Sequence, residues 1–237
     1  ARTEGRRLPR VQTMKTPVLH AHRIDRRTAC LAGALLFGTL LLTACAQTPS
    51  VSSMAPAREG AVTVFYRRSS GSLGDYDGRV SWKVHDGRWH GRHVEAHISP
   101  QMGGQVVDPQ TQGLIAVLDR LGEVQYTFDP PLTYPWPLQV GKRWENHYSV
   151  TDIAQGHRLP VTVQGRIESW GDVTVPAGAF TAFKLVWADS LGEVESRWIE
   201  TEQGIGTVKR TVLRLPSHPA GPGHLEAELL SRNLVQP

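Results

Sequence analysis

Short alternating segments separated by turn residues run through most of this chain, and this pattern constrains its fold most strongly. Val80, Trp82 and Val84 alternate with polar neighbours, and Asp86-Gly87 follows them as a predicted hairpin turn. Because successive side chains of a strand point to opposite faces, such a segment buries one face and exposes the other. The pattern predicts β-strands, and no segment after residue 45 combines a helical period with helix caps.

The same pattern recurs along the rest of the chain. Further predicted strands lie at residues 113–118, 124–128, 144–150, 159–165, 166–170, 181–187, 194–199 and 207–215. Turn residues recur about every 8–12 residues, at Gly74, Gly103-Gly104, Asp129–Pro131, Gly156, Gly171-Asp172, Gly192 and Gly204. The sequence predicts an all-β domain, an antiparallel meander that forms a curved sheet or incompletely closed barrel. Residues 225–234 favour a helix locally, but as a last strand they would close the sheet.

A basic and then apolar segment precedes this region. Residues 29–43 (ACLAGALLFGTLLLT) are apolar and follow Arg23, Arg26 and Arg27. The run is shorter than the roughly 20 residues that a membrane-spanning helix needs. A basic region, an apolar run and small residues before a cleavage point are typical of a secretory signal peptide.

The stretch Leu42-Thr43-Ala44-Cys45 ends this run and resembles the lipobox of bacterial lipoproteins. The resemblance implies that Cys45 is diacylated on sulfur, that the leader is cut before it, and that the freed amine is then acylated. Two or more acyl chains attach a protein stably to a bilayer. In this family an aspartate after the cysteine retains the protein at the inner membrane. Ala46 stands there instead and implies the outer membrane, on its periplasmic face.

We therefore expect three parts in the chain. Residues 1–44 are a leader, with Met14 as the expected start and residues 14–44 as the signal peptide. Residues 45–60 are the lipidated N-terminus and a disordered, flexible tether, because they are small and polar and contain two prolines. Residues 61–237 form a single periplasmic β domain.

Most of the excess positive charge belongs to the leader. The chain has a net charge of +4, but residues 1–44 contain eight of its 26 Lys and Arg and two of its 22 Asp and Glu. The remaining 18 basic and 20 acidic residues give a net charge of −2 from residue 45 onward. This balance leaves no basic patch that would predict binding to nucleic acid or to anionic lipid. Cys45 is the only cysteine after the leader, so no disulfide can form within one molecule.

Three phrases in the second half look like a known pattern and occur in its order. They are Tyr134–Trp144 (YPWPLQVGKRW), Val173–Phe180 (VTVPAGAF) and Gly204–Lys209 (GIGTVK). Over roughly residues 110–215, the chain resembles the TapB-like envelope domains, an uncharacterised family common in bacterial lipoproteins. The resemblance implies a fold class and a compartment, and no activity.

Four histidines fall close together, at His85, His90, His93 and His97, with Glu95 among them. On an extended strand His93, Glu95 and His97 share one face, where two imidazoles and a carboxylate could hold Zn²⁺. An exposed polar strand face has the same pattern, and no cysteine or second carboxylate completes a closed site. We keep these three residues as weak candidates for a metal-dependent hydrolase, and we predict no metal and no cofactor.

Other catalytic motifs are weak. The chain has no Gly-x-Ser-x-Gly elbow and no phosphate-binding glycine loop. Glu193 and Glu195 share a strand face and could cooperate in glycoside hydrolysis. The same spacing is common on solvated strands, so the sequence favours a protein that is not an enzyme.

All seven tryptophans follow the leader, and core packing is the simplest explanation for them. They are Trp82, Trp89, Trp136, Trp144, Trp170, Trp187 and Trp198. The sequence predicts an outer-membrane lipoprotein that acts without catalysis, as a binding or scaffolding module for an envelope partner. An aromatic-lined cavity would make it a periplasmic carrier of an acyl chain or another apolar ligand. The metal-dependent hydrolase is the second alternative.

Overall fold

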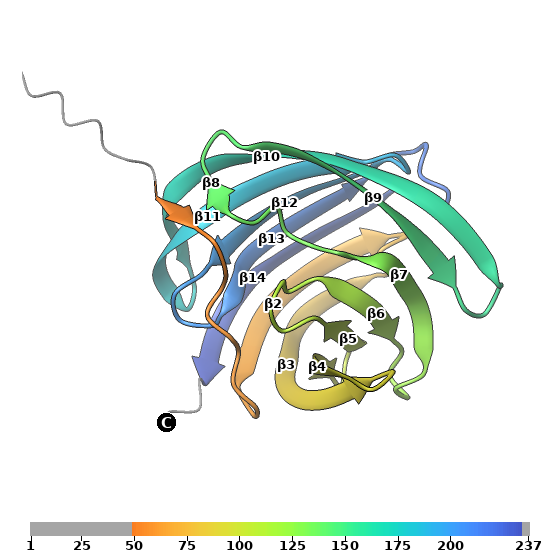
Figure 1. Cartoon of the computed structure of the whole chain (residues 1–237), viewed down its shortest axis with the longest axis horizontal. Helices are drawn as coiled ribbons and strands as arrows, with labels where there is room; N and C mark the ends of the chain where they lie inside the picture. The colour runs from red at the N-terminus through yellow and green to blue at the C-terminus, as the bar shows by residue number, and fades with distance from the viewer. Residues whose placement is uncertain (1–48, 234–237) are drawn as a thin grey trace, which may run out of the picture. The chain divides into compact units, whose positions relative to one another are not determined.

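The computed structural model of the protein describes residues 49–233. Within this range, twelve antiparallel strands form a closed barrel, and two short strands form a separate sheet (Figure 1). Cys45, Ala46 and the leader lie outside the described residues. No helix in this range is long and apolar enough to cross a membrane.

The barrel strands follow one another in chain order, and the last one, β14, pairs with the first, β2. They are β2 (Val62–Gly71), β3 (Tyr76–Trp89), β4 (Arg92–Ser99), β5 (Gly103–Val107), β6 (Leu114–Leu118), β7 (Val124–Leu132), β9 (Arg143–Asp152), β10 (His157–Val175), β11 (Gly178–Asp189), β12 (Glu193–Glu200), β13 (Gly206–Arg214) and β14 (Gly223–Asn233). This order confirms the predicted antiparallel meander. The sheet closes completely because β14 pairs with β2 from Gly223–Gly71 to Asn233–Val62.

Four of the predicted turns lie inside strands, and one of them, Gly103-Gly104, begins β5. Asp86-Gly87 falls within β3, where the two residues pair with Glu95 and Val94 of β4. The hairpin turns instead at His90 and Gly91, whose φ angles are 47° and 81°. Two consecutive positive φ angles match the right-handed twist of the strands in a two-residue hairpin, so the chain turns at these two residues. The turns predicted at 129–131 and 171–172 likewise fall within β7 and β10.

Apolar side chains form three packed clusters. The first contains Leu138, Ile167, Phe183, Leu185 and Ile199, the second Val175, Phe180, Ala182, Val208 and Leu229, and the third Val94, Val106 and Ala116. Most of the tryptophans pack against a cluster: Trp136, Trp144 and Trp187 on the first, Trp198 on the second and Trp89 on the third. These five side chains therefore serve as packing residues.

The segment before β2 lies against the barrel. Strand β1 (Ser50–Val51) pairs with β8 (Leu138–Gln139), and Met54 packs against the first cluster. The backbone N–H of Ala55 donates to the carbonyl of Thr201 at 2.8 Å. The flexible tether predicted for residues 45–60 is therefore corrected from residue 49 onward. Packing of Val51 and Met54 on the first cluster, together with these backbone hydrogen bonds, holds the segment on the barrel.

Candidate functional site

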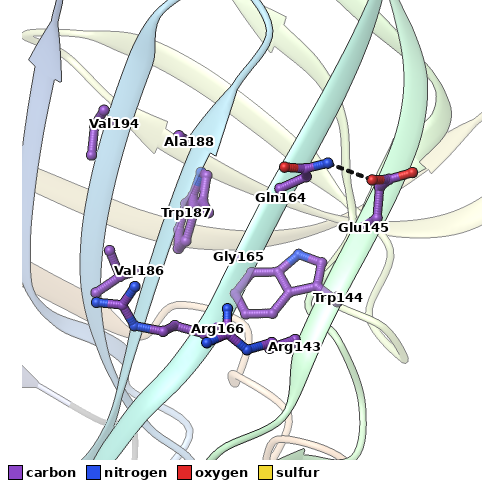
Figure 2. A pocket seen from close by; sticks show the side chains of 10 residues that line it. All are labelled: Arg143, Trp144, Glu145, Gln164, Gly165, Arg166, Val186, Trp187, Ala188 and Val194. Atoms are coloured by element: carbon purple, nitrogen blue, oxygen red, sulfur yellow. Dashed lines mark hydrogen bonds between the residues drawn. The ribbon is translucent and has the colours of Figure 1, made fainter.

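A hollow of about 640 Å³ lies over β9, β10, β11 and β12 (Figure 2). Its lining residues are Arg143, Trp144, Glu145, Gln164, Gly165, Arg166, Val186, Trp187, Ala188 and Val194. The strand register arranges them in three rows that run across the sheet. Two rows point outward, and the third lies between them and points into the barrel.

The first outward row carries positive charge. Arg143 of β9 is the direct partner of Arg166 of β10, which in turn pairs with Val186 of β11. Both arginines are exposed. Figure 2 shows their side chains along one edge of the hollow.

The second outward row is polar at one end and apolar at the other. Its members in order are Glu145, Gln164, Ala188 and Val194. The Gln164 side chain donates to the Glu145 carboxylate at 2.6 Å. Ala188 has the smallest side chain of this row and lines the hollow beside Gln164.

The middle row consists of Trp144, Gly165 and Trp187, which pair across β9, β10 and β11. A Cβ atom on Gly165 would lie 2.4 Å from the ring of Trp144. Only glycine therefore lets this ring pack against β10. The centroids of the Trp144 and Trp187 rings are 6.4 Å apart, and both rings pack on the first apolar cluster. Aromatic side chains thus pack behind the part of the sheet that lies beneath the hollow.

The charged groups at the hollow differ in how fully they are paired. Arg166 donates to Glu168 at 2.5 Å, and Lys184 binds the same carboxylate at 2.5 Å. Hydrogen bonds from Lys184 and Arg166 lower the pKa of Glu168. Glu145 also contacts His147 at 2.9 Å. Arg143 has no hydrogen-bond or ion-pair partner among residues 49–233, so it is available to a ligand.

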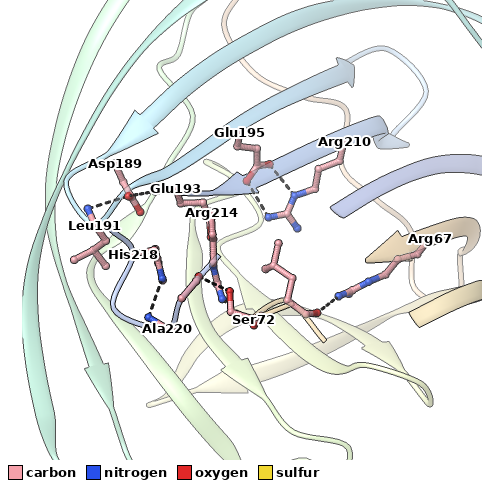
Figure 3. Close-up of polar contacts among 12 residues, drawn as sticks. Arg67, Ser72, Asp189, Leu191, Glu193, Glu195, Arg210, Arg214, His218 and Ala220 are labelled. Atoms are coloured by element: carbon pink, nitrogen blue, oxygen red, sulfur yellow. Dashed lines mark hydrogen bonds and ion pairs between the residues drawn. The ribbon is translucent and has the colours of Figure 1, made fainter. Parts of the chain in front are cut away.

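A second polar cluster lies on the inner face of the barrel (Figure 3). Glu195 is 3% exposed, and its carboxylate accepts hydrogen bonds from Arg197 at 2.6 Å and from Arg210 at 2.8 Å. Arg197 also donates to the Tyr134 hydroxyl at 2.6 Å. Burial alone would lower the pKa of Arg197, but Glu195 and Tyr134 hold it above its ordinary value.

Glu193, from the same strand, pairs with Arg214 at 2.8 Å. Glu193 and Glu195 share a strand face as predicted, but this face is not the solvated one on which such a spacing is common. Their face of β12 points inward, where Glu195 lies opposite Val212. In the described part of the chain, every buried side-chain nitrogen or oxygen has a hydrogen-bond partner. We interpret this cluster as a structural network whose charges are already engaged.

The three weak metal candidates have different surroundings. They lie on β4, but the His93 side chain is 62% exposed and faces Asp86 at 3.6 Å, whereas Glu95 is buried. Glu95 contacts His97 at 3.4 Å and accepts a hydrogen bond from Gln112 at 3.2 Å. Residues 49–233 contain no group of three His, Cys, Asp or Glu side chains placed to hold a metal ion. The structure does not bring His93, Glu95 and His97 together as ligands.

Sequence analysis did not identify the arginine edge of the hollow. Arg143 and Arg166 are far apart in the chain, and only the register of the β9–β10 hairpin places them opposite each other. That register depends on the turn after Asp152, which pairs with His157. A one-residue slip would turn one of the arginines to the other face.

No protein-family profile matches the chain, and no curated protein matches it, so the resemblance to the TapB-like domains stays a prediction. Three solved structures are similar to it. One is a predicted exported protein with a YmcC-like fold from Bacteroides fragilis, at 12% identity and a TM-score of 0.46, over 77% of this chain and 99% of that chain. A predicted lipoprotein from Parabacteroides distasonis has 15% identity and a TM-score of 0.42, over 78% and 100%. The hypothetical lipoprotein YmcC from Escherichia coli has 10% identity and a TM-score of 0.41, over 74% and 85%.

Proposed function

We propose that this protein is a lipid-anchored envelope protein that acts by binding, without catalysis, and that the hollow over β9–β12 is its binding surface. The observation that carries the proposal is the hollow itself. It combines an arginine whose side chain is unpaired among the described residues, a glutamine–glutamate pair and small apolar side chains. Tryptophans pack behind this part of the sheet. A small number of polar groups on a largely preformed surface is typical of ligand sites.

The anchor is proposed from the sequence. The Leu42–Cys45 stretch favours acylation of Cys45, and Ala46 favours the outer membrane, with the barrel on its periplasmic side. The barrel would then be held beside a bilayer while its outer face remains available to an envelope partner.

The anchor is tested by expressing the full chain in a bacterium supplied with labelled palmitate. We expect the label on the processed protein and the protein in the membrane fraction. The Cys45→Ser variant should lose both the label and the normal processing. A Cys45→Ser variant that is processed and labelled like the natural chain would overturn the anchor.

The binding surface is tested by photocrosslinking in the same cells. A photoreactive residue at Ala188 should capture one defined species, identified by mass spectrometry, and a second substitution that fills the hollow, Val194→Trp, should abolish the capture. Ala179 is the matched control, since it is an exposed alanine on the same strand, outside the hollow. Equal capture from Ala179, or capture that survives Val194→Trp, would contradict the proposed surface.

A further inference from the structure

We propose that the arginine edge of the hollow binds the phosphate group of anionic phospholipids in the bilayer that holds Cys45. The inference rests on the lipid anchor of the proposed function and names the ligand of the hollow. Three observations carry it. Two arginines are neighbours on adjacent strands, the acidic side chains near them are already engaged by other groups, and only a short stretch of chain separates Cys45 from Ser50 on the barrel.

The arginine pair places two like charges side by side, and of the two only Arg166 has an acidic partner among residues 49–233, Glu168. Arg143 and Arg166 are direct cross-strand neighbours on the outer face. Like charges directly opposite each other destabilise an antiparallel pair. An anion between the two guanidinium groups would remove this repulsion, and arginine presents donors in the geometry that phosphate oxygens accept.

The acidic groups nearby do not cancel the pair. Glu168 is shared between Arg166 and Lys184, and Glu145 is engaged by Gln164 and His147. Arg143 keeps all of its donors, because no described residue accepts from it. The edge therefore has positive charge to offer to an external anion.

The attachment of the N-terminal segment brings this edge to the membrane. Ser50 pairs with Gln139 of β8, and the turn that follows β8 is bound to Ile167, next to Arg166. The backbone N–H of Gly141 donates to the Ile167 carbonyl, and that of Ile167 to the Lys142 carbonyl, each at 2.9 Å.

Four residues lie between Cys45 and Ser50, so five steps of the chain join them, and an extended chain spans at most about 3.6 Å per step. Acyl chains on Cys45 thus keep Ser50 within about 18 Å of the bilayer surface. Ser50 pairs with Gln139, four residues before Arg143, so the arginine edge belongs to the part of the barrel that is tied to the anchor. The turn between β9 and β10 lies at the other end of β9, a strand of 10 residues.

The test uses the acylated full chain in vesicles with nitroxide-labelled headgroups. A single cysteine at Ala188 carries a fluorophore, because acylation occupies Cys45 and the processed chain has no other cysteine. We expect strong quenching in vesicles of phosphatidylcholine with phosphatidylglycerol and weaker quenching in phosphatidylcholine alone. A fluorophore at Gln155, an exposed residue of the far turn, should be quenched little in both.

The arginine variants decide the assignment. Arg143→Gln with Arg166→Gln should reduce the response to phosphatidylglycerol by about fivefold for each charge removed, whereas Arg158→Gln, near the far turn, should leave it unchanged. Quenching that ignores lipid charge, or that survives the double variant, overturns the proposal. Inorganic phosphate that binds the detergent-solubilised chain as tightly as the lipid would show that the site takes free phosphate, and overturns the membrane source. Failure of the anchor is distinguished beforehand, because an unanchored chain would not float with vesicles of phosphatidylcholine alone.

Discussion

Two buried glutamates show how differently the two sides of this barrel are built. Glu195 lies in the wall, which we define as β9 to β14 with β2, and Glu95 lies in the curl, β3 to β7, seen as the tight roll in Figure 1. Both side chains are almost completely buried, at 3% and 2% exposure. Glu195 has two arginine partners, whereas Glu95 has a histidine and a glutamine.

The difference between the partners of the two glutamates follows from the length of the strands around them. In the wall, β10 has 19 residues and β11 has 12, and long neighbouring strands place several charged side chains on one inner face. In the curl, β5 and β6 have five residues each, and a small cluster of Val94, Val106 and Ala116 fills the interior. The wall is therefore held partly by buried ion pairs, and the curl by close backbone approach.

The largest expected effect would test the wall. Glu195→Gln keeps the shape of the side chain but leaves Arg197 and Arg210 without their counter-ion. Breaking a buried ion pair in this way costs about 3–5 kcal/mol. We expect this loss in the free energy of unfolding measured by urea denaturation. Glu228→Gln is the control, since its pair with Lys209 is partly exposed and should contribute less than about 1 kcal/mol. Equal losses would show that the wall does not depend on its buried pairs.

The next effect would test the curl. Gly103 begins β5 with a φ of 89°, and a Cβ atom there would lie 2.2 Å from the backbone oxygen of Leu118. Gly103→Ala should cost about 3 kcal/mol, because backbone strain adds to a steric clash that no side-chain movement relieves. Gly122 has a similar φ of 85° but open space around it. Gly122→Ala should therefore cost only about 1 kcal/mol in the same denaturation experiment. A milder loss at Gly103 than at Gly122 would contradict close approach as the basis of the curl.

The sequence predicted the elements of the wall better than those of the curl. Segments 181–187, 194–199 and 207–215 each fall within or at the edge of an observed strand, because alternation over a long strand is a strong signal. The turns of the curl were predicted less well from the sequence. Asp86-Gly87 carries a turn signal, but the ladder to β4 continues through it, so tertiary pairing overrides local preference.

The candidate site was predictable only in part. Trp144 and Trp187 were recognised as packing residues, and they back the wall beneath the hollow. The pairing of Arg143 with Arg166 was not, because register is a property of two strands and the turn between them. The burial of Glu195 was not predictable for a related reason, since alternation places residues on one face without saying which face is buried.

A pH titration of the free energy of unfolding would test the burial of a tyrosine in the wall. Burial raises the pKa of Tyr148 above its ordinary value of 10.0, and the negative charges of Asp189, Glu193 and Glu195 act in the same direction. The folded protein therefore keeps this phenolic proton at a pH where the unfolded chain releases it. The contribution of Tyr148 to stability is constant below pH 10 and falls as the pH rises above it.

We expect the free energy of unfolding to fall by about 1 kcal/mol between pH 10 and pH 11 on account of this group. Tyr148→Phe should remove that part of the fall. Tyr126→Phe, at an exposed tyrosine, should leave it in place. An alkaline slope that is identical in the two variants would mean that the inner face is open to solvent.

The smallest expected effect returns to the curl. Within residues 49–233, no arginine or lysine pairs with Glu95, so Glu95→Gln leaves none of these cations without a partner. The amide retains an oxygen that can accept from Gln112, and one neutral hydrogen bond contributes about 1 kcal/mol. We therefore expect a loss below about 1 kcal/mol in urea denaturation, against the several kcal/mol of Glu195→Gln. A loss as large as that of Glu195→Gln would place a buried ion pair in the curl as well. The double variant Glu95→Gln with His97→Gln would then identify it, because the two losses would not add if the carboxylate and the imidazole stabilise each other.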